Sequence, residues 1–200
     1  MKRLRIYIWL CFALIMNSLW AQTPAVLIKG QADSRECEEW VEAHLKEMTL
    51  KEKIGQLFIH TVAPQVTEHN RKNIRDAVKE YKIGGLLFSG GELGNQVTLT
   101  NMAQEMASIP LLITFDGEWG LAMRLKGTMS YPKNRVLGGI QENKLLYEYG
   151  KEVARQCREM GVHVNFAPVA DVDNNPLNPV INTRSVVCCF PEESWGIKLR

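Results

Sequence analysis

The sequence predicts an α/β protein whose strands pair in parallel. From residue 33 onward, short apolar runs of strand length alternate with amphipathic stretches of helix length. Apolar strands without polar alternation are buried on both faces, and the helices that connect them impose parallel pairing. A (β/α)8 barrel and a doubly wound sheet both satisfy this pattern. No Gly-x-Gly-x-x-Gly motif follows a predicted strand, which counts against the dinucleotide-binding form of the doubly wound sheet.

The composition is that of a globular protein without a polyanion-binding surface. Hydrophobic residues make up 46% of the chain and charged residues 23%, which excludes a disordered or low-complexity protein. The formal net charge is +2, and three of the basic residues (Lys2, Arg3 and Arg5) lie in a predicted leader. Because the remainder carries no basic excess, we expect no nucleic-acid partner.

Residues 1–21 have the pattern of a signal peptide. A basic start precedes an uncharged apolar run over residues 6–16, and Ala21 offers a cleavage point. A membrane-spanning helix needs roughly 20 apolar residues, so this run is too short for one. We expect an exported protein, periplasmic or secreted, with no membrane segment after leader removal and with residues 22–35 as a lead-in. An uncleaved N-terminal anchor is the alternative.

Two helix starts precede the first predicted strand. Asp33 or Ser34 can cap a first helix, and Thr49 followed by Glu52 matches a capping box. A first buried strand is then predicted over residues 55–62. The apolar face of the first helix consists of Cys37, Trp40, Val41, Leu45 and Met48.

Three further units repeat the order of helix and strand. The apolar residues of their helices are Ile74, Ala77, Val78 and Tyr81; Leu99, Met102, Ala103 and Met106; and, over about residues 145–160, Leu146, Tyr149, Val153, Cys157 and Met160. The second helix is predicted to end near residues 84–85, and Gly161 caps the last one. The strands that follow are predicted over residues 86–89, 111–115 and 162–169.

Polar residues collect where the predicted strands end. They are Ser89 to Glu92 after the second strand, Asp116, Glu118, Trp119 and Arg124 after the third, and Asp171, Asp173 and residues 182–184 after the fourth. The carboxyl ends of parallel strands meet at one edge of the sheet, where sites form in both candidate folds. An isolated Asp after a strand is more often a helix cap. The clustering of Asp116, Glu118 and Arg124 instead favours a polyhydroxylated ligand, because carboxylates accept and arginine donates several hydrogen bonds.

The histidines and cysteines form no metal-binding or nucleophilic motif. His44 and His69 are predicted to be solvated, and His60 and His163 to lie in the core or line a barrel. Cys37 and Cys157 are predicted to be buried thiols, and the adjacent Cys188 and Cys189 have no ligand spacing to any histidine. We therefore expect no metal and no cofactor.

Four ordered strings carry a resemblance to a known family. They are residues 48–57 (MTLKEKIGQL), the Asp116-x-Glu118-x-Gly120-x-x-x-Arg124 motif, residues 161–172 (GVHVNFAPVADV) and residues 178–185 (NPVINTRS). Together they resemble the N-terminal half of the catalytic domain of glycoside hydrolase family 3, in particular its bacterial β-N-acetylhexosaminidases. The match covers residues 36–185, and Trp119 stands where many members have glycine.

The resemblance implies the N-terminal half of a (β/α)8 TIM-type barrel and retaining hydrolysis of non-reducing-end β-linked sugars. The expected partner is a carbohydrate with a β-linked amino sugar, in carbohydrate or peptidoglycan metabolism, and a family 3 β-glucosidase is the alternative. By the same resemblance, Asp116 holds hydroxyls of the terminal sugar, and Arg124 and Arg184 line its pocket. Asp171 is expected to be structural.

The resemblance also implies that the bond-breaking groups lie beyond residue 200. The family places a Lys-His motif, a His-containing acid/base loop and the nucleophilic Asp after its Arg-Ser motif, whereas residues 186–200 form a divergent tail without them. Retaining hydrolysis needs a nucleophile and an acid/base, so we expect no catalytic residue in this chain, and a fragment or disrupted gene near residue 186. Since a complete barrel takes about 250 residues, the alternatives are a non-catalytic sugar-binding half-barrel and self-association through open barrel edges.

Overall fold

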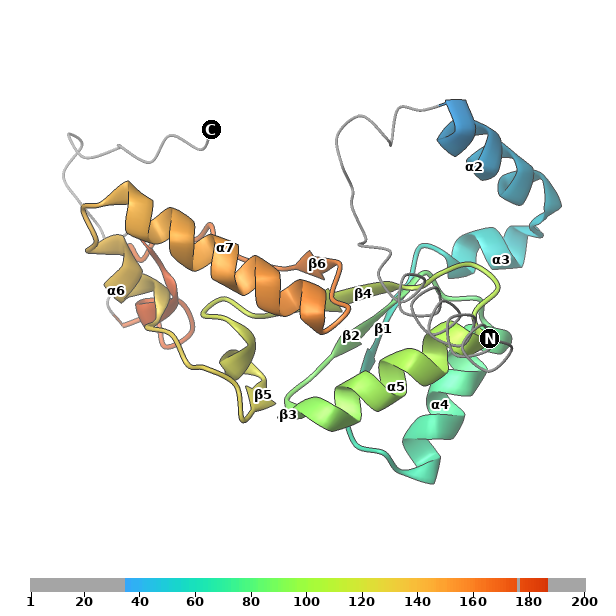
Figure 1. Cartoon of the computed structure of the whole chain (residues 1–200), viewed down its shortest axis with the longest axis horizontal. Coiled ribbons are helices and arrows are strands. Elements are labelled where there is room, and N and C mark those ends of the chain that lie inside the picture. Colours follow the sequence, from blue (N-terminus) through green and yellow to red (C-terminus); the bar gives the residue numbers. More distant parts are fainter. Residues whose placement is uncertain (1–34, 176, 187–200) are drawn as a thin grey trace, which may run out of the picture. The chain divides into compact units, whose positions relative to one another are not determined.

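The computed structural model describes residues 35–175 and 177–186 (Figure 1). It divides into two compact units between His44 and Leu45. The predicted leader, Cys188, Cys189 and the tail after residue 186 lie outside the described residues. Among the helices that are described, none has the length and apolar character needed to cross a membrane.

The first predicted helix is present as α2 (Arg35–Glu47), but its apolar face is not buried. No residue of α2 falls in the buried class, and Trp40 is about half exposed. The prediction of a buried Cys37 thiol was therefore wrong, because helical spacing of apolar residues does not by itself supply a packing surface. His44 was also predicted to be solvated, yet it is half-buried and stacks on the Trp40 ring at a centroid distance of 3.9 Å.

Four parallel strands form the main sheet, in the order β1-β2-β4-β6. The strands are β1 (Ile59–Val62), β2 (Gly85–Phe88), β4 (Leu112–Phe115) and β6 (Val164–Asn165), and the helices between them are α4 (Glu68–Lys79), α5 (Leu93–Met106) and α7 (Asn143–Glu159). Each strand pairs with the strand of the next unit, without the reversal of order that a doubly wound sheet contains. This is the order of consecutive strands in a (β/α)8 barrel, and it confirms the predicted fold class.

The first strand is shorter than predicted because the end of a short helix and the turn after it occupy its first half. Thr49 and Glu52 form the predicted capping box: Thr49 N–H donates to Glu52 Oε2 at 2.8 Å, and Glu52 N–H donates to Thr49 Oγ1 at 3.3 Å. The helix that it starts, α3 (Leu50–Gly55), ends in a turn in which Phe58 N–H donates to the Gly55 carbonyl at 3.0 Å. Residues 55–58 are therefore helix end and turn, and β1 begins at Ile59.

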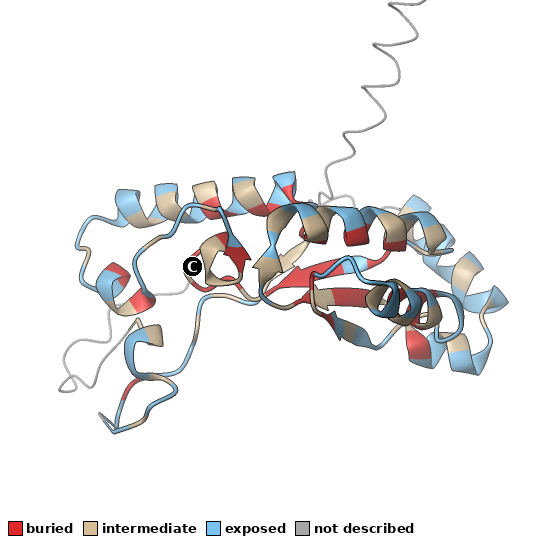
Figure 2. Cartoon of the chain, turned by 90° about the horizontal axis from the view of Figure 1, so that it is seen from below, coloured by how far each residue is buried: buried red, intermediate tan, exposed pale blue. Residues whose placement is uncertain are grey.

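The core lies between the sheet and the helices that cover it, as the buried residues in Figure 2 show. Its main side chains are Leu86, Phe88, Ile113 and Phe115 from the strands, and Ile74, Ala77, Val78, Leu99, Ala103, Val153 and Cys157 from the helices. Helices α4 and α5 pack against each other (Figure 1), and these faces are the predicted ones. Tyr81 is an exception: α4 ends at Lys79, not near residue 84, and Tyr81 lies exposed in the turn that follows.

The last helix–strand unit contains a much shorter strand than predicted. Gly161 follows α7 with a φ of 68°, which confirms its predicted capping role. The strand predicted over residues 162–169 is reduced to β6, because Ala167 N–H donates back to the Asn165 carbonyl at 2.9 Å and the chain turns there. His163 precedes β6 and is half-buried, and its Nδ1 accepts a hydrogen bond from Ile113 N–H at 2.9 Å.

Candidate functional site

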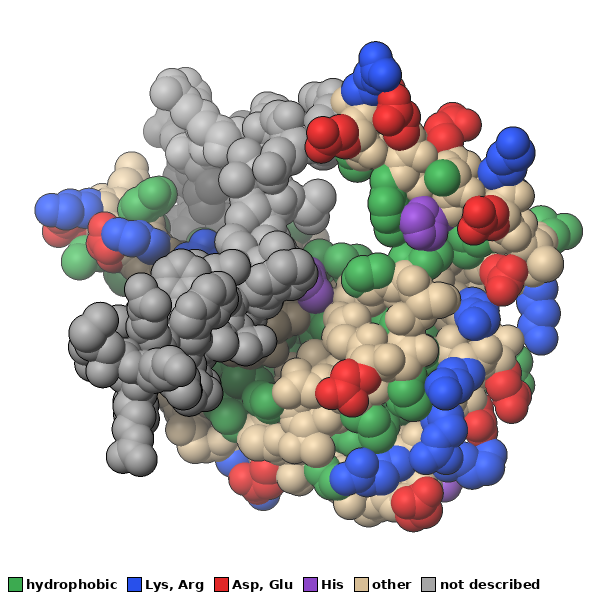
Figure 3. Space-filling view, turned by 45° about the vertical axis from the view of Figure 1, so that its right-hand side comes forward, with side chains coloured by type: hydrophobic (Ala, Val, Ile, Leu, Met, Phe, Trp, Pro, Cys, Tyr) green, Lys and Arg blue, Asp and Glu red, His purple; other side chains and the backbone are tan. Residues whose placement is uncertain are grey.

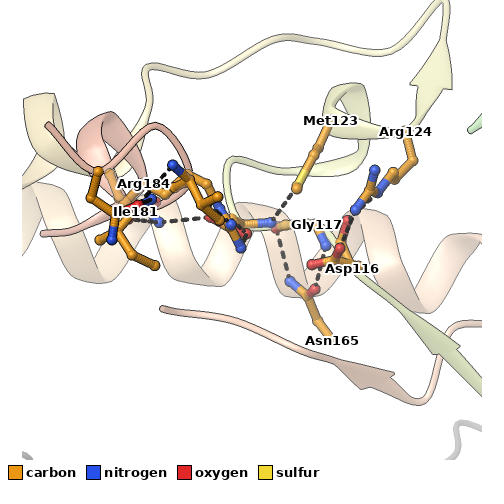
Figure 4. A network of polar contacts seen from close by, with 11 residues as sticks. Asp116, Gly117, Met123, Arg124, Asn165, Ile181 and Arg184 are labelled. Carbon is orange, nitrogen blue, oxygen red and sulfur yellow. Dashed lines mark hydrogen bonds and ion pairs between the residues drawn. The ribbon is translucent and has the colours of Figure 1, made fainter. Parts of the chain in front are cut away.

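Asp116 and Arg124 form an ion pair at the C-terminal end of β4. Asp116 is the first residue after the strand, and its carboxylate accepts from Arg124 Nη2, while Arg124 Nε donates to the Asp116 carbonyl at 3.3 Å (Figure 4). The two side chains are 30% and 36% exposed, so both remain accessible to a ligand. Two of the three predicted binding residues are therefore in direct contact.

The position of Arg124 depends on the loop that follows β2. Gly91 N–H donates to the Arg124 carbonyl at 2.9 Å, and the two-residue strand β3 (Gly91–Glu92) pairs in parallel with β5 (Leu125–Lys126). A Cβ atom on Gly90 would lie 3.2 Å from the Arg124 carbonyl oxygen, and one on Gly91 would lie 2.4 Å from Cγ of Pro64. Gly90 and Gly91, at the end of the second predicted strand, thus help to position the backbone of Arg124.

Arg184, the third predicted binding residue, is held by Glu118. Arg184 Nη2 donates to Glu118 Oε1 at 2.7 Å, and Arg184 Nε donates to Oε1 at 2.9 Å and to Oε2 at 3.2 Å. The Glu118 side chain is only 1% exposed, whereas that of Arg184 is 35% exposed. Hydrogen bonding to Glu118 raises the pKa of the Arg184 guanidinium, and the nearby charges of Glu118, Asp116 and Asp171 act in the same direction. Arg184 is therefore a fixed cation with one accessible side.

Asn165 of β6 holds the turn that carries these carboxylates. Its Oδ1 accepts from Gly117 N–H at 2.9 Å, and its Nδ2 donates to the Gly117 carbonyl at 3.1 Å. In Figure 4 the amide of Asn165 faces Gly117, which lies between Asp116 and Glu118 in the sequence. One side chain thus satisfies both backbone groups of the residue between the two acidic positions.

The two carboxylates predicted after the fourth strand have different surroundings. Asp173 is buried and forms an ion pair with Arg135 of the short helix α6 (Asn134–Gly138). Asp171 is exposed, and its carbonyl accepts a hydrogen bond from Oγ of the buried Ser185 at 2.7 Å. Both residues therefore help to hold the loop that carries Arg184.

Trp119 is half-buried in the turn after β4, directly after Glu118 in the sequence. The Nζ atom of Lys133 lies 5.5 Å from the centroid of its ring, a cation–π distance.

Sequence reasoning placed Glu118 among the ligand-binding side chains, whereas the structure buries it against Arg184, and it assigned no role to Asn134 or Asn165. Glu118 belongs to the predicted cluster, and Asn165 belongs to one of the four motif strings, so both were visible as candidates. Their partners lie 66 and 48 residues away. Asn134, whose Nδ2 donates to the Arg184 carbonyl at 2.8 Å, lies in no motif, and no spacing in the sequence could have revealed it.

Each of the two acidic side chains that follow β4 is already paired with an arginine. Glu118 is buried and paired with Arg184, and Asp116 is paired with Arg124, so each carboxylate already has a charged partner. In residues 35–175 and 177–186, no three His, Cys, Asp or Glu side chains form a group that could hold a metal ion. Charges of both signs are scattered over the face shown in Figure 3.

Comparison with known proteins identifies the family. Residues 49–187 match the model of the glycosyl hydrolase family 3 N-terminal domain. The chain is 35% identical over 132 residues to beta-hexosaminidase A of Pseudoalteromonas piscicida, covering 56% of this chain and 21% of that protein. It is 27% identical over 144 residues to beta-hexosaminidase LpqI of Mycobacterium tuberculosis, covering 68% of this chain and 34% of that protein. The chain thus spans about a third or less of the length of these relatives.

Solved structures support the fold. The structure of beta-glucoside phosphorylase BglX bound to 2FGlc superposes with a TM-score of 0.72 at 22% identity, over 81% of this chain and 29% of that protein. The structure of M. tuberculosis LpqI superposes with a TM-score of 0.59 at 22% identity, over 72% of this chain and 42% of that protein. From its family-model match and this shared fold, the chain belongs to glycosyl hydrolase family 3, as part of its N-terminal domain.

Proposed function

We propose that this chain forms the sugar-binding half of the site of an exported β-N-acetylhexosaminidase, which removes non-reducing-end β-linked amino sugars. Family membership and the relatives that are named beta-hexosaminidases support this activity. The observation that carries the proposal is the pair of arginine–carboxylate contacts that follow β4, Asp116 with Arg124 and Glu118 with Arg184. The apolar run over residues 6–16 supports the export of the protein.

The two pairs have different proposed roles in sugar binding. Asp116 accepts hydrogen bonds from hydroxyls of the terminal sugar, and Arg124 orients its carboxylate while offering its remaining N–H groups. Glu118 is too buried to reach a ligand, so it orients Arg184, whose accessible side donates to the sugar. A carboxylate acceptor and a preorganised guanidinium together discriminate among hydroxyl positions, because a polar group left unpaired costs binding energy.

We assign the nucleophile and the acid/base to sequence outside this chain. Retaining hydrolysis needs two carboxyl groups, or their equivalents, on opposite sides of the glycosidic bond. The pairing of Asp116 and Glu118 with arginines supports a binding role for these residues in place of that chemistry. A β-glucosidase is the second candidate, because the chain is 26% identical to a protein of Cellulomonas fimi named beta-N-acetylglucosaminidase/beta-glucosidase.

The test is titration of the purified chain with N-acetylglucosamine and with glucose, followed by NMR or calorimetry. We expect binding of N-acetylglucosamine and a rise in Kd of about tenfold or more in the Asp116→Ala variant, the loss expected for hydrogen bonds to a charged group. Asp76→Ala is the matched control, because Asp76 is also paired with a cation, Lys72, and its side chain is 31% exposed. Absence of sugar binding, or equal weakening by both substitutions, would contradict the proposal.

A second measurement concerns cleavage. We expect no hydrolysis of a chromogenic β-N-acetylglucosaminide by this chain, and hydrolysis by a form extended with a complete family 3 barrel. Repeated turnover by the chain alone would show that the catalytic groups lie within it. Sedimentation of the same samples would test self-association, which a stable monomer excludes.

A further inference from the structure

Lys133 and the first residues of α6 contact two separate parts of the candidate site. Lys133 caps the helix and lies over the Trp119 ring, with 5.5 Å between Nζ and the ring centroid. The next two residues, Asn134 and Arg135, contact the loop that carries Arg184. None of these three residues belongs to the motifs that identify the family. A helix of five residues therefore connects the turn after β4 to a loop about 50 residues further along the chain.

Asn134 contacts both the backbone of Arg184 and the carboxylate that orients its side chain. The Asn134 amide is buried, with an exposed fraction of 1%, and Nδ2 donates to the Arg184 carbonyl at 2.8 Å and to Glu118 Oε2 at 3.4 Å. Both partners are acceptors, so only the NH2 group can face them. Arg184 is consequently held by Glu118 at its guanidinium and by Asn134 at its carbonyl.

Arg135 contacts the same loop at Asn182, whose φ is positive. Its Nη2 donates to the Asn182 carbonyl at 2.9 Å, and its guanidinium also forms the ion pair with Asp173. Asn182 has a φ of 33°, a region that residues other than glycine seldom adopt and that persists where surrounding contacts hold it. The contact therefore falls on the residue with a positive φ among the described residues 182–186 of this loop.

The other end of α6 packs against the same loop. A Cβ atom on Gly138 would lie 2.1 Å from the carbonyl oxygen of Val186, so only glycine fits. This close approach is independent of the polar contacts, and it shows that the helix and the loop are packed together along the length of α6.

We propose that Asn134 and Arg135 are positioning residues, which hold the loop at residues 182–186 so that Arg184 presents its guanidinium to the sugar. That the ligand is a sugar rests on the proposed function, whereas the effect on the loop does not. Neither residue needs to touch the ligand. Their substitution should loosen the loop and, through it, weaken sugar binding.

The test measures hydrogen exchange and sugar binding in Asn134→Ala. In the wild type, Arg184 N–H donates to the Ile181 carbonyl at 2.7 Å, and Leu112 N–H in β4 donates to the Gly84 carbonyl at 2.8 Å, so both amides are protected. We expect exchange at Arg184 to accelerate by about tenfold relative to exchange at Leu112, the effect of losing a buried hydrogen bond. The Kd for N-acetylglucosamine should rise by about the same factor.

Two further variants keep the test decisive. Asn101→Ala makes the same substitution at an exposed position of α5 and should change neither quantity. If Asn134→Ala fails to fold, Arg135→Lys tests the same loop, because lysine keeps a positive charge beside Asp173 but lacks the fork that also reaches Asn182. Arg135→Lys should then accelerate exchange at residues 182–185.

The outcomes separate this inference from the proposed function. Unchanged exchange at Arg184 in the α6 variants overturns the positioning role, whatever happens to sugar affinity. A loosened loop with unchanged affinity also overturns it, because Arg184 would then bind sugar without support from α6. If the wild-type chain binds no sugar, the proposed function fails, and the exchange measurement still decides whether α6 holds the loop.

Discussion

Glu118 and Arg184 share an ion pair, but their environments are unequal. The carboxylate is 1% exposed, and the guanidinium that contacts it at 2.7 Å is 35% exposed. Water can therefore reach Arg184 but not Glu118. The pair therefore consists of a buried anion and an accessible cation. Because of this difference, removing one partner should change the free energy of unfolding by a different amount from removing the other.

Arg184→Ala should destabilise the chain more than Glu118→Ala. Removing the arginine leaves a buried carboxylate without its cation, which costs about 3–5 kcal/mol. Removing the glutamate leaves a guanidinium that solvent can hydrate, so we expect the free energy of unfolding to fall by about 1–3 kcal/mol. Urea denaturation of both variants measures the difference. Glu105→Ala, at an exposed position, should be neutral, and equal losses in the first two variants would contradict the asymmetry.

Asn165→Asp should destabilise the turn between the two acidic residues. The substitution preserves shape but replaces the NH2 group, which donates to the Gly117 carbonyl at 3.1 Å, with a second acceptor oxygen. We expect a loss of about 1–3 kcal/mol in the free energy of unfolding, because the Gly117 carbonyl then faces a carboxylate. Asn101→Asp, on the exposed face of α5, is the control for the added charge. A loss no larger than that of the control would show that the contact contributes nothing to stability.

Two glycine-to-alanine substitutions should have effects of opposite sign. A Cβ atom on Gly55 would lie 2.0 Å from the Tyr81 carbonyl oxygen, and backbone atoms cannot move away cheaply, so Gly55→Ala should cost about 1–3 kcal/mol. Gly150 lies exposed within α7 and has nothing within 4 Å of the same position. Gly150→Ala should therefore stabilise the chain by about 0.5–1 kcal/mol through reduced backbone entropy of the unfolded state. Thermal unfolding of the two variants tests both signs.

His163 should make stability fall as the solution is acidified. Burial lowers its pKa below the ordinary value of 6.5, and its Nδ1 accepts from Ile113 N–H, which only an unprotonated nitrogen can do. The unfolded chain therefore binds a proton at a higher pH than the folded chain, and this contribution, fully present above about pH 7, decreases as pH falls through 6.5 toward the folded pKa.

The variant His163→Asn isolates this effect, because its Oδ1 can accept the hydrogen bond but does not titrate. We expect a shallower loss of unfolding free energy between about pH 7 and pH 5 in this variant than in the wild type. His69→Asn, the same substitution at an exposed position, is the control. Parallel slopes in wild type and His163→Asn would exclude His163 as the source.

Local sequence patterns predicted the helices better than the strands. The capping box at Thr49 and the glycine at position 161 were both confirmed, since each depends on atoms within a few residues. The first and last strands were predicted too long, because an apolar run does not distinguish a strand from a turn that packs against other parts of the core. Strand β6 has two residues because the chain turns after Asn165 and pairs with β4 no further.

The same distinction applies to the candidate site. Asp116, Glu118 and Arg124 could be recognised together because they lie within nine residues at the end of one predicted strand. The contacts of Arg184 with Glu118 and with Asn134 join residues 66 and 50 positions apart, and no periodicity extends that far. Burial distinguishes the two carboxylates: Glu118 is buried and orients Arg184, whereas Asp116 remains accessible.

By itself, the sequence determined the α/β class, the order of the helix–strand units and the residues that carry the family motifs, because these follow from local spacing and residue type. The tertiary structure alone decided the strand order, the pairing of each acidic residue with a particular arginine, and the contribution of α6. The physical reason is that hydrogen bonds and burial depend on distances in space, which chain folding sets between residues that are remote in sequence.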